Sequence, residues 1–289
     1  RSEIKIQNKT DFKKNKEDVI REYLTDNGFY EVINFPFVKE NTSNSILIDN
    51  PLDSNKKYMR TSLQKCLENN LSFNERRQKD SIKLFEISDI YRYENKIIKD
   101  KKIGIIATGR LGHNFKDFSK GIDKNYFEGV LSFFIDHNKN NPFIFTEISR
   151  DLINSKSKDK IFFVEFNISD LADISYVQKN KKPTSFVKYK KISEYPSITR
   201  DLSFALEDPS KYYELQELLL NYQNKYLKTV FIFDFFNNKD QAKLKIGFRF
   251  MFQSVEKTLS DSEIDNIMND IINQSLKINS VMIPGLKWI

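Results

Sequence analysis

The stretch "KLKIGFRFMFQSVEKTLSDSEIDNIMNDIINQ", residues 243–274, decides the fold of the C-terminal part of the chain. In its first ten residues, apolar side chains alternate with others, and a strand sends successive side chains to opposite faces. One face carries Leu244, Ile246, Phe248, Phe250 and Phe252. The other face carries Lys243, Lys245, Gly247, Arg249 and Met251. The pattern predicts a strand over 243–253 with an apolar core face and a basic outer face.

The remainder of the stretch predicts a helix over 261–277. Ser260 and Glu263 have the spacing of a capping box, and Leu259 and Ile264 that of a hydrophobic staple. Apolar residues then recur at helical intervals and supply a stripe that packs on a sheet.

The neighbouring segments complete a known order of elements. We expect a strand at 201–207, a helix at 211–226, and strands at 229–236 and 280–288. The resulting βαββαβ order predicts a ferredoxin-like domain. Strand 243–253 is central in that sheet, so its basic face is an open surface for phosphates and bases. The alternative is a solvated face without a ligand.

The entry to this domain, "SEYPSITRDLSFALE" at residues 193–207, places two opposite charges side by side. Pro196 fixes the backbone before the strand. Arg200 and Asp201 then point to opposite sides of the pleat, and an arginine there can stack on a base or bind a phosphate. The alternative is an Arg–Asp pair that pins the edge of the strand.

The preceding part of the chain mixes helices and strands without regular alternation, which favours an antiparallel α+β core. Helices are expected within residues 14–32 and 61–74, the second capped by Thr61 or Ser62. Strands are expected within 81–93, 101–110 and 160–168. A polar stretch precedes residue 192, so we expect two domains, 1–190 and 191–289, with the boundary near residues 188–192.

Composition limits the class of protein. The chain has 289 residues, a net charge of +7, and one cysteine, Cys66. A single cysteine excludes a disulfide framework, which favours the cytoplasm. The longest apolar run is well short of the roughly 20 residues that cross a bilayer, so no membrane partner is expected. The sequence begins at Arg1 instead of a methionine, so we expect a piece of a longer polypeptide.

Three stretches resemble one family, that of the β chain of bacterial phenylalanyl-tRNA synthetases. They are "GFYEVINFPFV" at 28–38, "NPLDSNKKYMRTSLQKCLENNLSFNERRQKDSIKLFEISDIY" at 50–91, and "YPSITRDLSFAL" at 195–206. The resemblance implies a noncatalytic core similar to class II synthetases, which assembles with the catalytic α chain. It also implies a C-terminal domain that binds the anticodon region of tRNA(Phe), and further modules upstream. Around residues 148–160 the chain looks shorter than the family and lacks its H-P-G segment.

Catalytic and cofactor motifs are missing from the sequence. Only 8 glycines occur, none in the G-x-G-x-x-G or G-K-[ST] spacing that holds phosphates. His113, His137 and Cys66 do not have metal-ligand spacing, so we expect no metal site and no catalytic residue. The resemblance implies that ATP and Mg²⁺ are used by the α/β holoenzyme and that no cofactor is bound by this chain.

The candidate site residues form two groups. We expect tRNA contacts from Arg200, Asp201, Lys243, Lys245 and Arg249, and an α/β subunit interface at Arg60 and Thr61. For Arg60 the alternative is a salt bridge with Asp49 or Glu86. Two other classes of protein stay open: a free-standing ferredoxin-like RNA-binding module with a scaffold domain, and a ligand-sensing regulatory domain.

Overall fold

The computed structural model describes residues 14–51, 53–112, 115–138, 143, 145–153, 155, 157–177, 189, 191–238 and 243–285. The chain forms two compact units, Arg1–Gly109 with Ile122–Pro183, and Arg110–Gly121 with Thr184–Ile289. Part of the predicted boundary lies outside the described residues, and the division at 190/191 stays a prediction.

The first unit is built on a five-stranded sheet with the order β1-β4-β5-β7-β6. The two longest strands, β4 (Ser81–Glu94) and β5 (Lys96–Gly109), form a hairpin. Next to it lie β7 (Ile161–Asn167) and β6 (Thr146–Ile148), both antiparallel to their neighbours, whereas β1 (Tyr30–Glu31) is parallel to β4. The α+β class with a mainly antiparallel core is therefore confirmed.

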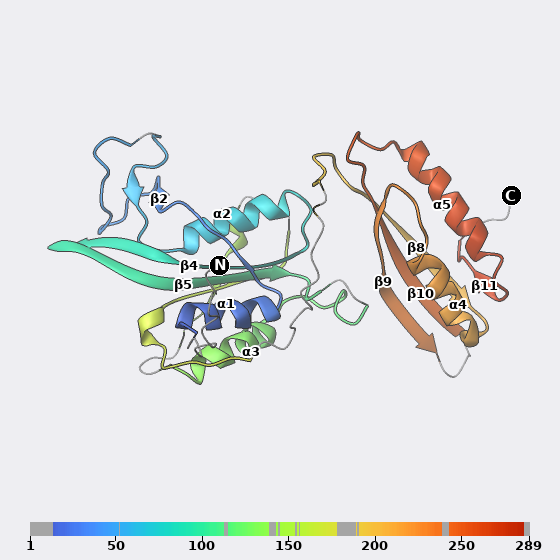
Figure 1. The fold of residues 1–289 in the computed structure, drawn as a ribbon, viewed down its shortest axis with the longest axis horizontal. Coiled ribbons are helices and arrows are strands. Elements are labelled where there is room, and N and C mark those ends of the chain that lie inside the picture. The colour runs from blue at the N-terminus through green and yellow to red at the C-terminus, as the bar shows by residue number, and fades with distance from the viewer. Residues whose placement is uncertain are drawn as a thin grey trace, which may run out of the picture. The chain divides into compact units, whose positions relative to one another are not determined.

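Helices cover both faces of this sheet (Figure 1). Helices α1 (Lys16–Asp26) and α3 (Lys124–Ile135) lie on one face, and the Tyr23 hydroxyl donates to the Val130 carbonyl at 2.8 Å. Helix α2 (Gln64–Glu75) covers the other face so closely that a Cβ on Gly104 would lie 2.9 Å from Leu67 Cδ1. Short elements complete the unit, namely β2 (Phe37–Val38), β3 (Tyr58–Met59), η1 (Arg150–Leu152) and η2 (Ile168–Asp170).

The start of α2 differs from the sequence expectation. Its N-cap residue is Leu63, and neither Thr61 nor Ser62 occupies that position. Instead, a carboxylate oxygen of Glu165 on β7 accepts from the Leu63 main-chain N–H at 2.6 Å and from the Ser62 hydroxyl at 2.8 Å. The Ser62 hydroxyl in turn accepts from the Gln64 N–H at 3.1 Å, so a carboxylate distant in sequence and the side chain of Ser62 together satisfy the start of the helix.

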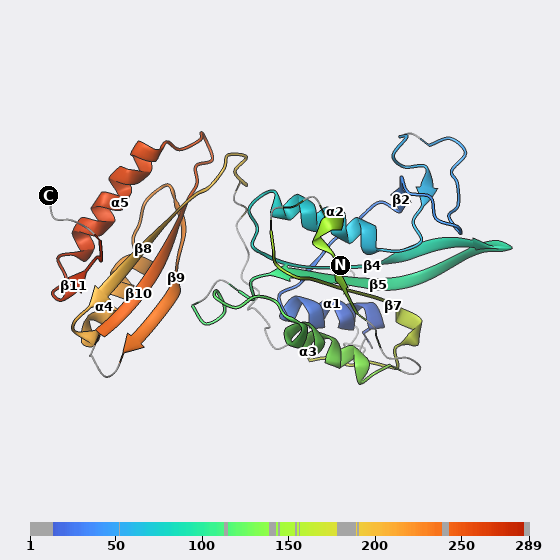
Figure 2. The same ribbon diagram turned by 180° about the vertical axis from the view of Figure 1, so that it is seen from behind.

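The second unit contains the expected ferredoxin-like order. Its elements are β8 (Ile198–Leu206), η3 (Pro209–Lys211), α4 (Tyr212–Leu220), β9 (Leu227–Asn238), β10 (Lys243–Phe252), α5 (Asp261–Ser275) and β11 (Val281–Met282). The sheet order is β11-β8-β10-β9, so β10 is central as predicted. Both helices lie on one face of this sheet (Figure 2).

The core of the second unit follows the alternation in β10. Its five apolar side chains are all buried, together with Ile264, Met268 and Ile271 of α5. Both bonds of the predicted capping box between Ser260 and Glu263 are present.

Two elements of the second unit are shorter than expected. Helix α4 ends six residues earlier than expected, because the Asn224 side chain accepts from the Tyr226 N–H at 2.9 Å and starts a turn into β9. Strand β11 is shorter than predicted, and residues 286–289 lie outside the described part.

Across the described residues, none of the helices has both the length and the apolar character needed to span a bilayer.

Candidate nucleic-acid interface

Arg249 is the central charged side chain on the face of the second sheet that the helices do not cover. Its neighbours Phe248 and Phe250 are buried in the core, so Arg249 projects to the opposite face. Asp201 on β8 is its direct partner in register. The Asp201 carboxylate accepts from Arg249 Nε at 2.8 Å and from a terminal nitrogen at 2.7 Å. This two-point contact fixes the plane of the guanidinium group.

Two phenylalanines of β9 lie beside Arg249. Phe231 faces it across the strand pair, and a shift in register at Phe233 adds one residue to β9. A Cβ on Gly247 would lie 2.7 Å from the Phe233 ring, so the missing side chain at Gly247 gives the ring its place on the sheet. The guanidinium carbon of Arg249 is 5.3 Å from the centre of the Phe233 ring, within cation–π range.

Sequence reasoning missed these phenylalanines, although a signal was present. In "FIFDFF", residues 231–236, aromatic residues fall on both faces of a strand, so some of them must lie outside the core. Aromatic rings beside an arginine on a sheet form a surface on which unpaired bases can stack.

The predicted tRNA-binding residues do not all share this face. Lys245 is exposed on the same face, four residues before Arg249 and paired in register with Ala205 and Phe236, whereas the Lys243 side chain lies outside the described part. Arg200 projects toward the helices, where it donates to Asp261 at 2.6 Å and lies 4.0 Å from Asp265. Arg200 is therefore neutralised by acids of α5, and its contact with tRNA stays a prediction.

The outer face of this sheet is less open than the sequence suggests. Phe118, from the segment Arg110–Gly121, lies on it and is only 6% exposed. Its ring centre is 5.6 Å from that of Phe233 and 4.7 Å from the guanidinium carbon of Arg249. The expectation of a fully open basic face is thus corrected, because the chain covers the middle of it with its own aromatic side chain.

Arg60 is buried in the first unit, with 1% of its surface exposed. It donates to the Glu86 carboxylate at 2.9 Å and to the Asp89 carbonyl at 3.1 Å. Of the two alternatives for its salt bridge, Glu86 is the partner, and a place for Arg60 at the α/β subunit interface stays a prediction. Thr61 is half-buried with its hydroxyl 3.3 Å from that of Thr42, and its place at an interface stays a prediction.

The Arg60–Glu86 pair holds an exposed segment in place. Glu86 also accepts from the Asn34 side chain at 2.8 Å and from its main-chain N–H at 3.3 Å. The Arg60 main-chain N–H donates to the Pro36 carbonyl at 2.8 Å. Residues 30–37, the apolar segment, are thereby fixed with Ile33 93%, Tyr30 73% and Phe35 71% exposed. Sequence reasoning did not single out these three side chains.

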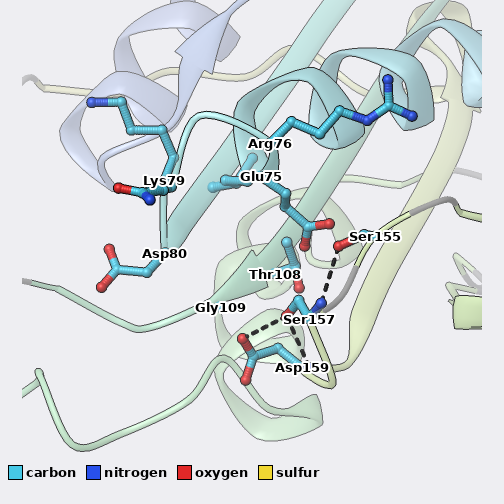
Figure 3. Close-up of a pocket in the computed structure, with 11 residues that line it drawn as sticks. Glu75, Arg76, Lys79, Asp80, Thr108, Gly109, Ser155, Ser157 and Asp159 are labelled. Atoms are coloured by element: carbon cyan, nitrogen blue, oxygen red, sulfur yellow. Dashed lines mark hydrogen bonds between the residues drawn. The ribbon is translucent and has the colours of Figure 1, made fainter. Parts of the chain in front are cut away.

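A groove of about 690 Å³ lies beside the C-terminal end of α2 in the first unit. Its lining includes Glu75, Thr108, Ser155, Ser157 and Asp159 (Figure 3). Glu75 pairs with Arg150 at 2.7 Å through one carboxylate oxygen. The other oxygen is closed to solvent and has no partner within the described ranges. A ligand in the groove cannot reach that oxygen, so this carboxylate does not make a binding site.

The remaining candidates for metal or nucleophile chemistry are structural. The ring nitrogen Nδ1 of His137 lies 2.7 Å from the Phe133 carbonyl, and His113 lies outside the described part. Cys66 is buried, and its burial raises the pKa of the thiol, which disfavours the reactive thiolate. In the part of the chain that the structure describes, no cluster of three or more His, Cys, Asp or Glu side chains could hold a metal ion.

Comparison with known proteins defines the class first. Residues 193–281 match the family model of the ferredoxin-fold anticodon-binding domain. Residues 2–149 match the model of the phenylalanyl-tRNA synthetase β chain CLM domain. The chain belongs to the phenylalanyl-tRNA synthetase β chain family.

Individual relatives agree with this assignment. The chloroplastic phenylalanine–tRNA ligase β subunit of Porphyra purpurea is 27% identical over 90% of this chain and 40% of its own length. The β subunit of Fusobacterium nucleatum is 27% identical over 88% of this chain and 36% of its own. The chloroplastic subunit of Pyropia yezoensis is 28% identical over 86% and 39%. The chain thus spans about two fifths of the length of these relatives.

Proposed function

We propose that this chain is the noncatalytic C-terminal part of a phenylalanine–tRNA ligase β subunit. In this proposal the first unit assembles with the catalytic α chain, and the second unit binds the anticodon region of tRNA(Phe). ATP and Mg²⁺ are then used by the α/β holoenzyme in the cytoplasm, and this chain contributes neither a catalytic residue nor a cofactor site. The observation that carries the proposal is the match to both family models, in order, along one chain.

The distribution of charge supports the strand face as the RNA surface. Acidic side chains of α5 surround Arg200 on the helix side, and they would repel phosphates. The strand side carries Lys245 and Arg249 next to Phe231 and Phe233. Cations with adjacent aromatic rings are the combination that binds single-stranded RNA.

Titration of tRNA(Phe) at several salt concentrations tests this surface. We expect Lys245→Ala to weaken binding and to lower the salt slope by about 0.7 to 1, the scale of one lost phosphate contact. Arg249→Ala should weaken binding of cognate tRNA more than that of other RNA, since a stacked arginine reads a base. Lys211→Ala, at the start of the helix layer, is the matched control. Unchanged affinity and slope in both strand-face variants would reject this face as the RNA surface.

The apolar segment supports a protein partner for the first unit. Three large apolar side chains exposed within residues 30–37 are unusual for a chain without a partner, because such patches mark protein interfaces. Asn34 and Glu86 fix the segment in place, so little conformational freedom would be lost on docking.

Copurification with the α chain tests this surface. We expect Ile33→Asp with Phe35→Asp to abolish retention of a tagged α chain, because the charges would be buried without partners. Tyr213→Asp, on α4 and 76% exposed, serves as the control. Full retention of the α chain by the Ile33→Asp/Phe35→Asp variant would show that the partner binds elsewhere.

A further inference from the structure

The segment Arg110–Gly121, here called the cover segment, follows β5 in the sequence but packs in the second unit. Its ends are joined by a bridge between Arg110 and Gly121 and by a 2.9 Å bond from the Leu111 N–H to the Lys120 carbonyl. Within this closed loop, Arg110 donates to the Phe118 carbonyl at 2.6 Å, and its guanidinium carbon is 4.2 Å from the centre of the Phe118 ring. The loop therefore holds Phe118 in one orientation.

The cover segment places one aromatic ring, that of Phe118, on the outer face of the sheet, and a second ring, that of Phe115, beside Phe235, which faces the core as the register partner of Ile246. The Phe118 ring centre lies 6.0 Å from that of Phe231 and 5.6 Å from that of Phe233. The Phe115 ring centre lies 5.3 Å from that of Phe235. Phe118 is almost fully buried by these contacts, so the closed arrangement removes an aromatic side chain from water.

The position of Phe118 determines access to Arg249. Phe118 and Phe233 both lie within cation–π range of its guanidinium group, at 4.7 and 5.3 Å. The edge of the group is held by the Asp201 carboxylate. The two ring centres are only 5.6 Å apart, so both rings lie toward the same side of the guanidinium group, and Phe118 takes the place that a base stacked on Phe233 and Arg249 would need.

We propose that Phe118 occupies the place of a stacked base and that the cover segment competes with RNA for the surface formed by Phe231, Phe233 and Arg249. The proposal rests on the proposed function, since it takes this face as the RNA surface. RNA with unpaired bases is the matching ligand, because a base offers the same flat aromatic face as Phe118 together with a phosphate for Lys245. Binding then requires the cover segment to leave, and the fraction of molecules in the open form sets the apparent affinity.

Binding of a tRNA(Phe) transcript to the full chain tests the proposal. Phe118→Ala removes the competing ring, and we expect tRNA affinity to rise about tenfold, the scale set by burial of one phenylalanine side chain. Arg110→Ala loosens the same ring, so affinity should rise in the same direction. Phe73→Ala is the matched control, because it removes an exposed ring from α2 in the first unit and should leave tRNA affinity unchanged. Unchanged or weaker binding by Phe118→Ala would overturn the proposal, the second result making Phe118 part of the RNA surface.

Hydrogen exchange of the unmodified chain gives a test that does not depend on folding of a variant. The Leu111 amide is bonded within the cover segment, and a segment that has left the sheet loses the packing of Phe118 that supports this loop, so we expect the amide to exchange faster when tRNA is bound. Slower or equal exchange would overturn the proposal. Failure of the proposed function has a different signature, since Lys245→Ala and Arg249→Ala would then leave tRNA binding unchanged. If these two variants bind weakly while Phe118→Ala binds like the unmodified chain, only the competition is rejected.

Discussion

The two sheets of this molecule use their faces differently. Helices cover both faces of the five-stranded sheet in the first unit, and its central arginine–glutamate pair, Arg60 and Glu86, is buried beneath the apolar segment. Helices cover one face of the four-stranded sheet in the second unit, and Arg249 lies on the other face with 24% of its side chain exposed. The same type of ion pair therefore supports a fold in one sheet and orients a surface cation in the other.

The difference shows why an arginine in or next to a strand does not identify a site by itself. A buried guanidinium group must be fully paired, because an uncompensated buried charge costs several kcal/mol. A pair at the surface contributes at most about 1 kcal/mol, so its geometry matters more than its stability. Arg60 thus holds the apolar segment in place through Glu86 and the Pro36 carbonyl. In the proposed open form, in which Phe118 leaves the sheet, the guanidinium group of Arg249 becomes more accessible.

The largest expected effect comes from breaking the buried pair. Glu86→Ala leaves Arg60 without its carboxylate and removes the acceptor of Asn34, so we expect a loss of about 3 to 5 kcal/mol of stability. Urea denaturation followed by circular dichroism measures the change. Glu94→Ala is the control on the same strand, since Glu94 is exposed and its pair with Arg92 should be worth less than about 1 kcal/mol. Equal stability of the two variants would show that the buried pair contributes no more to stability than a pair at the surface.

An intermediate effect is expected at Gly247. Gly247→Ala brings a Cβ within 2.7 Å of the Phe233 ring, so we expect a loss of about 1 to 3 kcal/mol, typical of overpacking. The double variant Gly247→Ala/Phe233→Ala should recover part of that loss, because the obstructing ring is gone. Gly129→Ala in α3 is the control of opposite sign: nothing lies within 4 Å of its Cβ, and alanine should stabilise the helix by about 0.8 to 1.0 kcal/mol. If Gly247→Ala left the free energy of unfolding unchanged, the Phe233 ring would be able to move aside without cost.

Sequence patterns predicted the local elements of the second unit well. The alternation in 243–252 and the capping box at Ser260 are encoded within a few residues, and the structure contains both. The order of the expected elements also predicted the α+β class and the ferredoxin-like domain, and both are confirmed.

Contacts between distant residues could not be predicted in the same way. The burial of Arg60 depends on Glu86 and on the segment around Pro36, which no local pattern connects to it. Phe118 lies more than a hundred residues before Phe231 in the sequence, so its place on the sheet is fixed only by tertiary packing. Arg200 is a different case. The alternation of side chains along the strand correctly put Arg200 and Asp201 on opposite faces of the sheet, but the acids that neutralise Arg200 belong to α5 and could not be assigned to it from a local pattern.

The smallest expected effect concerns the capping box of α5, which belongs to the covered side of the second sheet. Ser260→Ala removes the side-chain oxygen that accepts from the Glu263 N–H, and we expect a loss of about 1 kcal/mol. Asn266→Ala, at an exposed position further along α5, is the control and should not destabilise the domain. Both values come from urea denaturation, and a loss from Ser260→Ala no larger than that from Asn266→Ala would contradict the role of the cap.

The capping box also predicts how stability depends on pH. A bond from Lys257, followed by bonds from Ser260, lowers the pKa of Glu263 from its ordinary value of 4.5 to about 2. Between these two values the unfolded chain binds a proton that the folded chain does not, so folding loses stability as pH falls. The contribution of Glu263 is therefore complete above pH 4.5 and disappears progressively toward pH 2. The difference in stability between the unmodified chain and Glu263→Gln should shrink over this window, and a constant difference would show that the carboxylate is not held by the cap.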